Sequence, residues 1–231
     1  MSTGFAIEDL GENALLLRFG NTLDPDLNAR VHALAGELGH DRPGWLLDIV
    51  PAFATLALCI DLEALAGESE PLEAVRRWLA ARAAGEIRSP KEAPGRHHVI
   101  PVRYGGSDGP DLEAVARHAG IDTDEVIRRH TEATYRVAML GFAAGFPYLI
   151  GMDRQLAMPR RATPRTDVTA GSVGIGGAQT GIYPRRGPGG WQIIGRTGVD
   201  LFDAARDPPA LLGPGDTVSF ISDTAKTEPP R

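Results

Sequence analysis

The stretch from Met139 to Thr197 constrains the fold of this chain more than any other part of the sequence. Glycine, proline and aromatic residues are dense in it, and the helical spacing of apolar residues stops where it begins. Glycine permits positive φ and close backbone approach, whereas proline fixes φ near −65°. Short β-like pieces alternate with Gly/Pro turns at spacings of roughly ten residues, which indicates a closed barrel or a sandwich. The predicted strands are Ser172–Ile175, Thr180–Tyr183, Trp191–Ile194, Val199–Phe202 and, last in the chain, Thr217–Ile221.

The same region is strongly basic, although the whole chain carries a formal net charge of −6. Between Gly151 and Gly198 there are seven arginines and only two acids, an excess of five positive charges. A basic cluster within an acidic chain favours a small anionic ligand over nucleic acid or an anionic membrane. Any one of these arginines can instead solvate the surface or pair locally, so the cluster carries more weight than its members.

The first half of the chain predicts a small α+β unit. Apolar runs at Ala14–Phe19, Trp45–Val50 and Thr55–Ile60 are typical of strands. Apolar residues at spacings of three and four predict one helix after Asp24, which is placed to cap it, and a second over Pro71–Ala84. The order β-α-β-β-α indicates an antiparallel sheet with helices on one side.

The polar segment Ser89–Arg96 contains two prolines and marks the predicted domain boundary. We therefore expect domains at 1–90 and 91–225, with a polar tail at 226–231. A strand follows at His98–Tyr104, where Pro101 favours an edge position. The next predicted elements are the helices Asp111–Ala119 and Asp122–Ala133 and a strand at Tyr135–Phe142.

Several kinds of chemistry lack a supporting motif. No metal site is predicted, because His97 and His98 would point to opposite faces of a strand and no HxxxH or CxxC occurs. The glycine runs GSVGIGG and GPGG match neither nucleotide-binding fingerprint. Ser172 is not in a GxSxG turn and no histidine follows it, which argues against a serine hydrolase. Without a secretory signal or a long apolar segment, the expected location is the cytoplasm.

Two aromatic side chains in or near the stretch Met139–Thr197, those of His130 and Phe142, have an ordinary structural interpretation. A lone histidine at a helix end, such as His130, is more often a hydrogen-bonded core group than a catalyst. Phe142 is expected to fill the barrel core rather than to line a site.

Three sequence blocks resemble one known family: GFAAGFPYLIGMD, PRRATPRTDVTAGSVGIGGAQTGIYP and GPGGWQIIGRT. The family is that of the B component of the bacterial three-component 5-oxoprolinase, which also includes a sporulation-kinase inhibitor and proteins labelled allophanate hydrolase subunit 1. One half of the carboxyltransferase region of biotin-dependent urea carboxylase is similar as well. The chain departs from the family at Ala144, where proline is usual, and the loss of a fixed φ loosens that loop.

The resemblance implies an α+β protein with a small ferredoxin-like N-terminal domain followed by a cyclophilin-like antiparallel β-barrel. It implies a hetero-oligomer with a homologue of the C component, which carries a related barrel, and with a third oxoprolinase subunit. The implied reaction is ATP-dependent activation of 5-oxo-L-proline for ring opening to L-glutamate. ATP, together with Mg²⁺, would be shared with the partner.

The resemblance also implies roles for individual residues. His130 would be the proton-transfer or polarising group, and Arg161, Arg165 and Arg196 would bind the anion. The remaining implied site residues are Tyr148, Gln179, Thr180 and Trp191 around the pocket, and Gly145, Phe146, Pro147, Gly189 and Gly190 in the loops that shape it.

Three alternatives remain open on the sequence alone. The chain could be a regulatory inhibitor of a sensor histidine kinase, as one relative in the family is. It could be the carboxyltransferase component of a biotin-dependent urea or allophanate system. A prolyl isomerase is suggested only by the cyclophilin-like barrel, and a fold does not imply a function.

Overall fold

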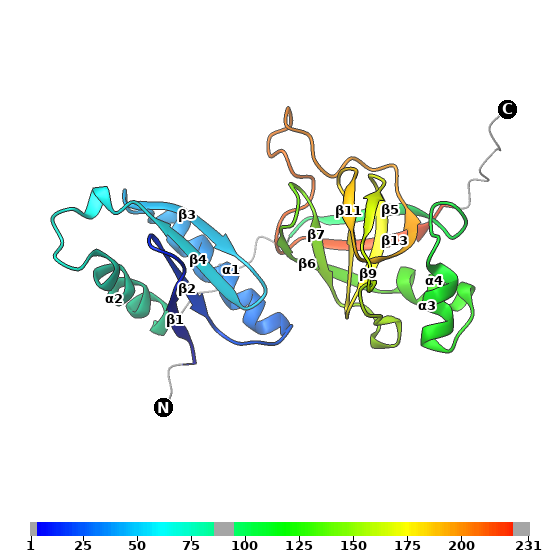
Figure 1. Ribbon diagram of the computed structural model, residues 1–231, viewed down its shortest axis with the longest axis horizontal. Helices are drawn as coiled ribbons and strands as arrows, with labels where there is room; N and C mark the ends of the chain where they lie inside the picture. The colour runs from blue at the N-terminus through cyan, green and yellow to red at the C-terminus, as the bar shows by residue number, and fades with distance from the viewer. Residues whose placement is uncertain (1–3, 86–94, 224–231) are drawn as a thin grey trace. The chain divides into compact units, whose positions relative to one another are not determined.

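The structure, a computed structural model, describes residues 4–85 and 95–223. It divides the chain into two compact units, residues 1–93 and 94–231, which are described separately below (Figure 1). Most of the predicted boundary segment Ser89–Arg96 and all of the tail at 226–231 lie outside the described residues.

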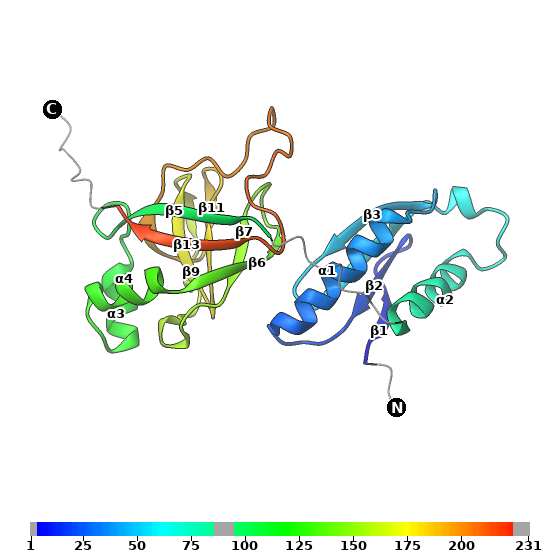
Figure 2. The same ribbon diagram turned by 180° about the vertical axis from the view of Figure 1, so that it is seen from behind.

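The N-terminal unit is a four-stranded antiparallel sheet with two helices. Leucines of α1, α2, β2 and β4 form one buried cluster, because every second residue of β4 faces the helices. Figures 1 and 2 both show α1 lying across the sheet. The elements are β1 (Ala6–Asp9), β2 (Ala14–Arg18), α1 (Pro25–His40), β3 (Leu46–Pro51), β4 (Thr55–Ile60), the short 3₁₀ turn η1 (Glu63–Leu65) and α2 (Pro71–Ala84).

The predicted β-α-β-β-α order is present in this unit. Asp24 caps α1 as expected, since its carboxylate accepts hydrogen bonds from the backbone N–H groups of Asp26 and Leu27. The strand β1 was not predicted, because its residues are mostly exposed and show no apolar alternation. It supplies the fourth strand of the sheet, whose order is β1-β2-β4-β3. The ferredoxin-like designation of this unit stays a prediction.

The C-terminal unit is built on a closed barrel of seven strands in the order β10-β7-β6-β13-β5-β12-β9. The strands β8 and β11 pair with each other in a separate two-stranded sheet. The bounds are β5 (His97–Tyr104), β6 (Thr134–Leu140), β7 (Pro147–Ile150), β8 (Arg165–Val168), β9 (Ser172–Gly176), β10 (Gln179–Ile182), β11 (Gly187–Gly189), β12 (Gln192–Arg196) and β13 (Thr217–Ser222).

Three expectations about the barrel were wrong. The barrel is mixed rather than antiparallel, because the last strand β13 enters between β6 and β5 and runs parallel to β5. Pro101 does not lie on an edge strand; pairing of β5 with β12 begins only at Arg103, so the proline needs a partner on one side alone. Val199–Phe202 forms only an isolated bridge to Ala210, since the barrel is already closed by other strands.

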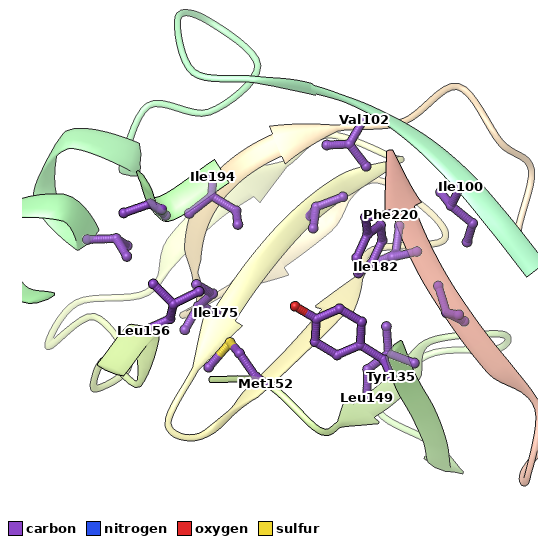
Figure 3. Packing of buried hydrophobic residues seen from close by; sticks show 14 of the residues in the cluster. Ile100, Val102, Tyr135, Leu149, Met152, Leu156, Ile175, Ile182, Ile194 and Phe220 are labelled. Carbon is purple, nitrogen blue, oxygen red and sulfur yellow. The ribbon is translucent and has the colours of Figure 1, made fainter. Parts of the chain in front are cut away.

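Two short helices lie side by side next to the barrel, as both views show (Figures 1 and 2). They are α3 (Leu112–Ala119), which ends at Gly120 in the left-handed conformation, and α4 (Thr123–Glu132); a 3₁₀ turn, η2 (Arg154–Leu156), follows β7. Figure 3 shows the side chains of several strands, including Tyr135 and Phe220, gathered in the barrel interior. No helix in the described part of the chain is long and apolar enough to cross a membrane.

A row of glycines lets one aromatic side chain lie directly on the barrel wall. A Cβ atom on Gly176 would come within 2.6 Å of the Trp191 ring, and one on Gly181 within 3.0 Å of it. At Gly174 the added atom would lie 3.1 Å from the Cβ of Trp191. The indole therefore occupies the space that side chains of β9 and β10 would otherwise fill.

We expect Gly176→Ala to destabilise the C-terminal unit by about 1–3 kcal/mol, because the added methyl group forces the indole off the sheet. Gly187→Ala is the matched control, since a Cβ atom at Gly187 meets nothing within 4 Å. Urea unfolding of both variants measures the difference. Equal stability of the two variants would contradict this packing.

Candidate functional site

A cavity of about 160 Å³ lies beside Trp191 and is called here the aromatic cavity. Phe146 is the centre of its wall, with ring centroids 5.0 Å from Tyr148, 5.2 Å from Tyr183 and 5.4 Å from Trp191. All three contacts are edge-to-face, an arrangement that favours a well-ordered wall. The cavity is lined by Phe142, Phe146, Tyr148, Arg160, Arg161, Pro164, Tyr183, Gly189, Gly190 and Trp191.

Glycine is required at two of the predicted loop positions. Gly145 has φ +78°, and a Cβ atom there would lie 2.8 Å from the Cβ of Phe202. A Cβ atom on Gly189 would lie 2.4 Å from the hydroxyl of Tyr183. Three further predicted residues lie in the same region: Gly190 and Phe146 line the cavity, and Pro147 begins β7. Ala144, where the family usually has proline, is exposed in this loop.

Phe142 does not fill the barrel core as expected. Its side chain is 64% exposed, and its φ of 65° is a left-handed value that costs a non-glycine residue of order 1–3 kcal/mol. The ring makes edge-to-face contacts with Phe146 and Tyr183. It thereby stands between the aromatic cavity and a second cavity of about 290 Å³ that Pro184, Arg185 and Pro188 also line.

Two of the predicted anion-binding arginines meet at a buried acid that was not predicted as a site residue. Asp111 is 5% exposed, and its Oδ1 accepts hydrogen bonds from Arg165 Nη2 at 2.8 Å and Arg161 Nη1 at 3.3 Å. Its Oδ2 accepts the backbone N–H of Ile193 at 2.6 Å. In the sequence Asp111 looks like a helix-start residue, and nothing there indicates that it is buried against arginines fifty or more residues away.

Arg196 lies apart from the aromatic cavity. Its Nε donates to the carbonyl oxygen of Ala170, and its Nη1 lies 4.0 Å from Asp108 Oδ1. With Arg165 it lines a third cavity of about 110 Å³. The structure thus brings Arg161 together with the aromatic wall, puts Arg196 elsewhere and leaves Arg165 between the two groups.

Gln179 and Thr180 belong to the buried strand β10 and line none of the three cavities. Thr180 Oγ1 donates to the carbonyl oxygen of Gly174 at 3.0 Å, which occupies its only hydrogen. Its 3.0 Å contact with His130 Nε2 is therefore a bond in which the imidazole donates. His130 Nδ1 is then left as an acceptor for the hydroxyl of Tyr104, at 2.7 Å.

This chain of hydrogen bonds favours the structural interpretation of His130 over the implied catalytic role, which stays an untested prediction. The ring is fully buried, stacks on Phe220 at 4.6 Å and has both nitrogens engaged. Burial lowers the pKa of His130 to about 3 and raises the pKa of Tyr104. His130 is accordingly neutral at physiological pH and ties α4 to β5 and β10, without contact with the aromatic cavity.

The described residues contain no group of three or more His, Cys, Asp and Glu side chains placed to hold a metal ion. The groups available at the aromatic cavity are instead flat apolar walls and cationic nitrogens. Arg161 is half-buried, and Arg160 is exposed with its guanidinium carbon 5.8 Å from the Trp191 ring centroid. The fold and this site define a two-unit α+β protein whose barrel unit has a small cavity lined by aromatic rings and arginines.

Comparison with known proteins places the chain in a family. The family model of the carboxyltransferase domain, subdomain C and D, matches residues 5–212. The B component of 5-oxoprolinase from Bacillus subtilis is 43% identical over 96% of this chain and 94% of its own length. The protein of the same name from Escherichia coli O157:H7 is 43% identical over 92% and 93%, respectively. The chain therefore belongs to the 5-oxoprolinase B-component family of carboxyltransferase-domain proteins.

A solved structure supports the fold over both units. The crystal structure of TTHA0988 superposes with a TM-score of 0.78 at 37% sequence identity and covers 94% of this chain. This chain spans 41% of that protein's length.

We expect Phe142→Gly to be more stable than Phe142→Ala by about 1 kcal/mol, because glycine relieves the left-handed φ that alanine retains. Both variants lose the same aromatic contacts, so the difference isolates the backbone strain. Urea unfolding of the C-terminal unit measures it. A Phe142→Ala variant as stable as Phe142→Gly would show that the φ at this position is unstrained.

The buried imidazole predicts a specific pH dependence of stability. The pKa of His130 is lower in the folded chain than the ordinary histidine value of 6.5, so the unfolded chain binds the proton more strongly. Stability is therefore full above about pH 6.5 and is lost as the pH falls toward 3, by at most about 1.4 kcal/mol per pH unit. His130→Gln should remove this part of the slope.

Urea unfolding at several pH values between 4 and 7.5 (roughly the window in which the unfolded-state imidazole gains its proton) measures the slope. His118→Gln, which changes an exposed histidine of α3, is the matched control. An identical slope for His130→Gln and the wild-type chain would mean that the imidazole is not held neutral in the fold.

Proposed function

We propose that this chain is one component of an ATP-dependent 5-oxoprolinase. With a homologue of the C component it activates 5-oxo-L-proline, and a third oxoprolinase protein finishes ring opening to L-glutamate in the cytoplasm. The observation that carries the proposal is the aromatic cavity with Arg161 in its wall, in a chain that aligns over nearly its whole length with 5-oxoprolinase B components.

The chemistry of the cavity matches the proposed substrate. 5-Oxo-L-proline is a flat five-membered lactam with one carboxylate. Edge and face surfaces of Phe146 and Trp191 provide apolar contact for such a ring. A guanidinium presents paired N–H donors that bind a carboxylate in a fixed orientation, and Arg161 supplies these at the cavity. At about 160 Å³ the cavity suits a small metabolite better than a drug-sized ligand.

The reaction would need ATP because a lactam is a resonance-stabilised amide, and its carbonyl carbon is a poor electrophile. ATP would supply its γ-phosphoryl group to the amide oxygen, with ADP as the leaving group, and the phosphorylated amide carbon would be a better electrophile. The arginines around the cavities fit an anionic phosphate. We place the nucleotide and its Mg²⁺ at a surface shared with the C-component homologue. This chain's own part is to bind the carboxylate, orient the ring and exclude water from its apolar faces.

A second candidate function comes from the matching family itself, which is described as a carboxyltransferase domain. In that case the same cavity would receive a small amide, such as urea, that accepts a carboxyl group from a biotin-bearing partner. The two functions have different requirements. The oxoprolinase hydrolyses ATP when 5-oxoproline is present and needs no biotinylated protein, whereas the carboxyltransferase needs one.

The chain is to be purified with its C-component homologue and the third oxoprolinase protein, and 5-oxoproline-dependent ATP hydrolysis measured. We expect activity only with all partners present. Arg161→Gln should raise the KM for 5-oxoproline at least about tenfold, because a charge-assisted bond to the carboxylate is worth roughly 1.5–3 kcal/mol.

Arg154→Gln is the matched control, since it removes the same charge from the exposed 3₁₀ turn η2, outside the three cavities. A KM that rises equally in both variants would assign the effect to overall charge. Turnover that depends on a biotinylated partner would favour the carboxyltransferase instead.

A further inference from the structure

We infer that Asp111 is a positioning residue whose buried carboxylate orients Arg161 and Arg165 and thereby sets the anion preference of the aromatic cavity. The inference rests on the proposed function for the identity of the anion, a small carboxylate. The orientation of the two arginines by Asp111 is independent of that identity.

The backbone of β12 holds Asp111 at two points. Its N–H donates to the carbonyl oxygen of Ile193 at 2.9 Å, and its Oδ2 accepts the N–H of Ile193 at 2.6 Å. Oδ2 is thus held by the backbone, and both arginines bond to Oδ1. Since Ile193 lies two residues after Trp191, the carboxylate is tied to the same stretch of chain that forms the cavity wall.

The two arginines share Oδ1 unequally. The bond from Arg165 is 2.8 Å long and that from Arg161 is 3.3 Å, so Asp111 satisfies Arg165 more fully. One carboxylate paired with two guanidinium groups leaves one net positive charge. Because Asp111 bonds more weakly to Arg161, this uncompensated charge lies mainly on Arg161, which lines the aromatic cavity. The backbone of Arg161 is fixed as well, because its N–H donates to the Gly190 carbonyl at 2.7 Å.

The cluster also has more donors than acceptors. Arg161 Nε and Arg165 Nη1 are buried and have no hydrogen-bond partner within the described residues. Buried N–H groups in this state are costly, and an incoming carboxylate brings the acceptors that the cluster lacks. An uncharged ligand of the same shape brings fewer. Asp111 should therefore matter for charged ligands and hardly at all for neutral ones.

The first test needs no substrate. Phenylglyoxal labels accessible guanidinium groups, and peptide mass spectrometry of the full chain resolves each arginine. We expect phenylglyoxal to label Arg161 and Arg165 several-fold faster in the Asp111→Asn variant than in the wild-type chain. The labelling rate of Arg160 should be unchanged. Unchanged labelling of both arginines would overturn the inference. Asp111→Glu, which keeps the charge but displaces it, decides the same question if the asparagine variant does not fold.

The matched control is Asp153→Asn. Asp153 also pairs with an arginine, accepting from Arg129 Nη1 at 2.9 Å, on the surface of the same unit and outside the three cavities. This substitution should leave the labelling of Arg161 and Arg165 at the wild-type rate. Faster labelling in the control as well would reflect general loosening of the unit and overturn the inference.

The second test measures ligand charge selectivity in the assembled complex. Asp111→Asn should raise the KM for 5-oxoproline about tenfold, as expected for the loss of one oriented charge-assisted contact. It should leave inhibition by 5-oxoprolinamide, which lacks the carboxylate, within about twofold, because that ligand makes no such contact. Equal losses for both ligands would indicate a merely structural role and overturn the inference.

A double-mutant cycle completes the design. If Asp111 acts through Arg161, then Asp111→Asn combined with Arg161→Gln is no worse than Arg161→Gln alone. Additive losses would overturn the inference. If the wild-type complex does not turn over 5-oxoproline, the proposed function fails, and the labelling result alone decides the role of Asp111.

Discussion

The candidate site depends on the absence of a side chain at three glycine positions of β9 and β10. Because Gly174, Gly176 and Gly181 carry no Cβ, the indole of Trp191 lies directly on the barrel wall and Phe146 packs edge-on against it. An alanine at any of the three positions would meet the indole or its neighbours within about 3 Å. The glycine-rich motif therefore makes room for an aromatic wall, which explains its density without any phosphate-binding role.

The electrostatics follow from acids that lie outside the basic stretch. Counted along the sequence, the stretch has a large positive excess. In the fold, Asp111 approaches from the turn before α3 and joins Arg161 and Arg165, while Asp108 from the same turn lies near Arg196. These two acids therefore reduce the positive excess, Asp111 by direct hydrogen bonds and Asp108 by its proximity to Arg196. Of the remaining arginines, Arg160 lines the aromatic cavity and Arg185 the second cavity, whereas Arg154 lies on the surface outside the three cavities.

Local patterns predicted most elements, and long-range packing explains the failures. The start of α1, with its capping Asp24, and both ends of α2 were predicted to the residue, because capping and apolar spacing are signals that lie within one or two turns. The parallel position of β13 depends on which strands close the barrel, and no local pattern encodes that choice. At the site, the resemblance to the family implied Tyr148, Arg161 and Trp191, and these three residues line the aromatic cavity; their roles stay predictions.

The sequence could not show that His130 is sealed inside the barrel or that Asp111 is buried, since both facts depend on contacts between distant segments. The exposed residues at the cavities give a reason why the proposed enzyme would need more than one kind of chain. Phe142, which lines both the aromatic cavity and the second cavity, is 64% exposed despite its strained backbone. Arg160 at the first cavity and Arg185 at the second are exposed too, and these three side chains are called here the rim. Phosphoryl transfer to an amide oxygen requires exclusion of water, which this open rim does not provide by itself. In the proposed complex, the C-component homologue would supply a second surface over the rim, which would exclude water from the cavity and bury these exposed side chains.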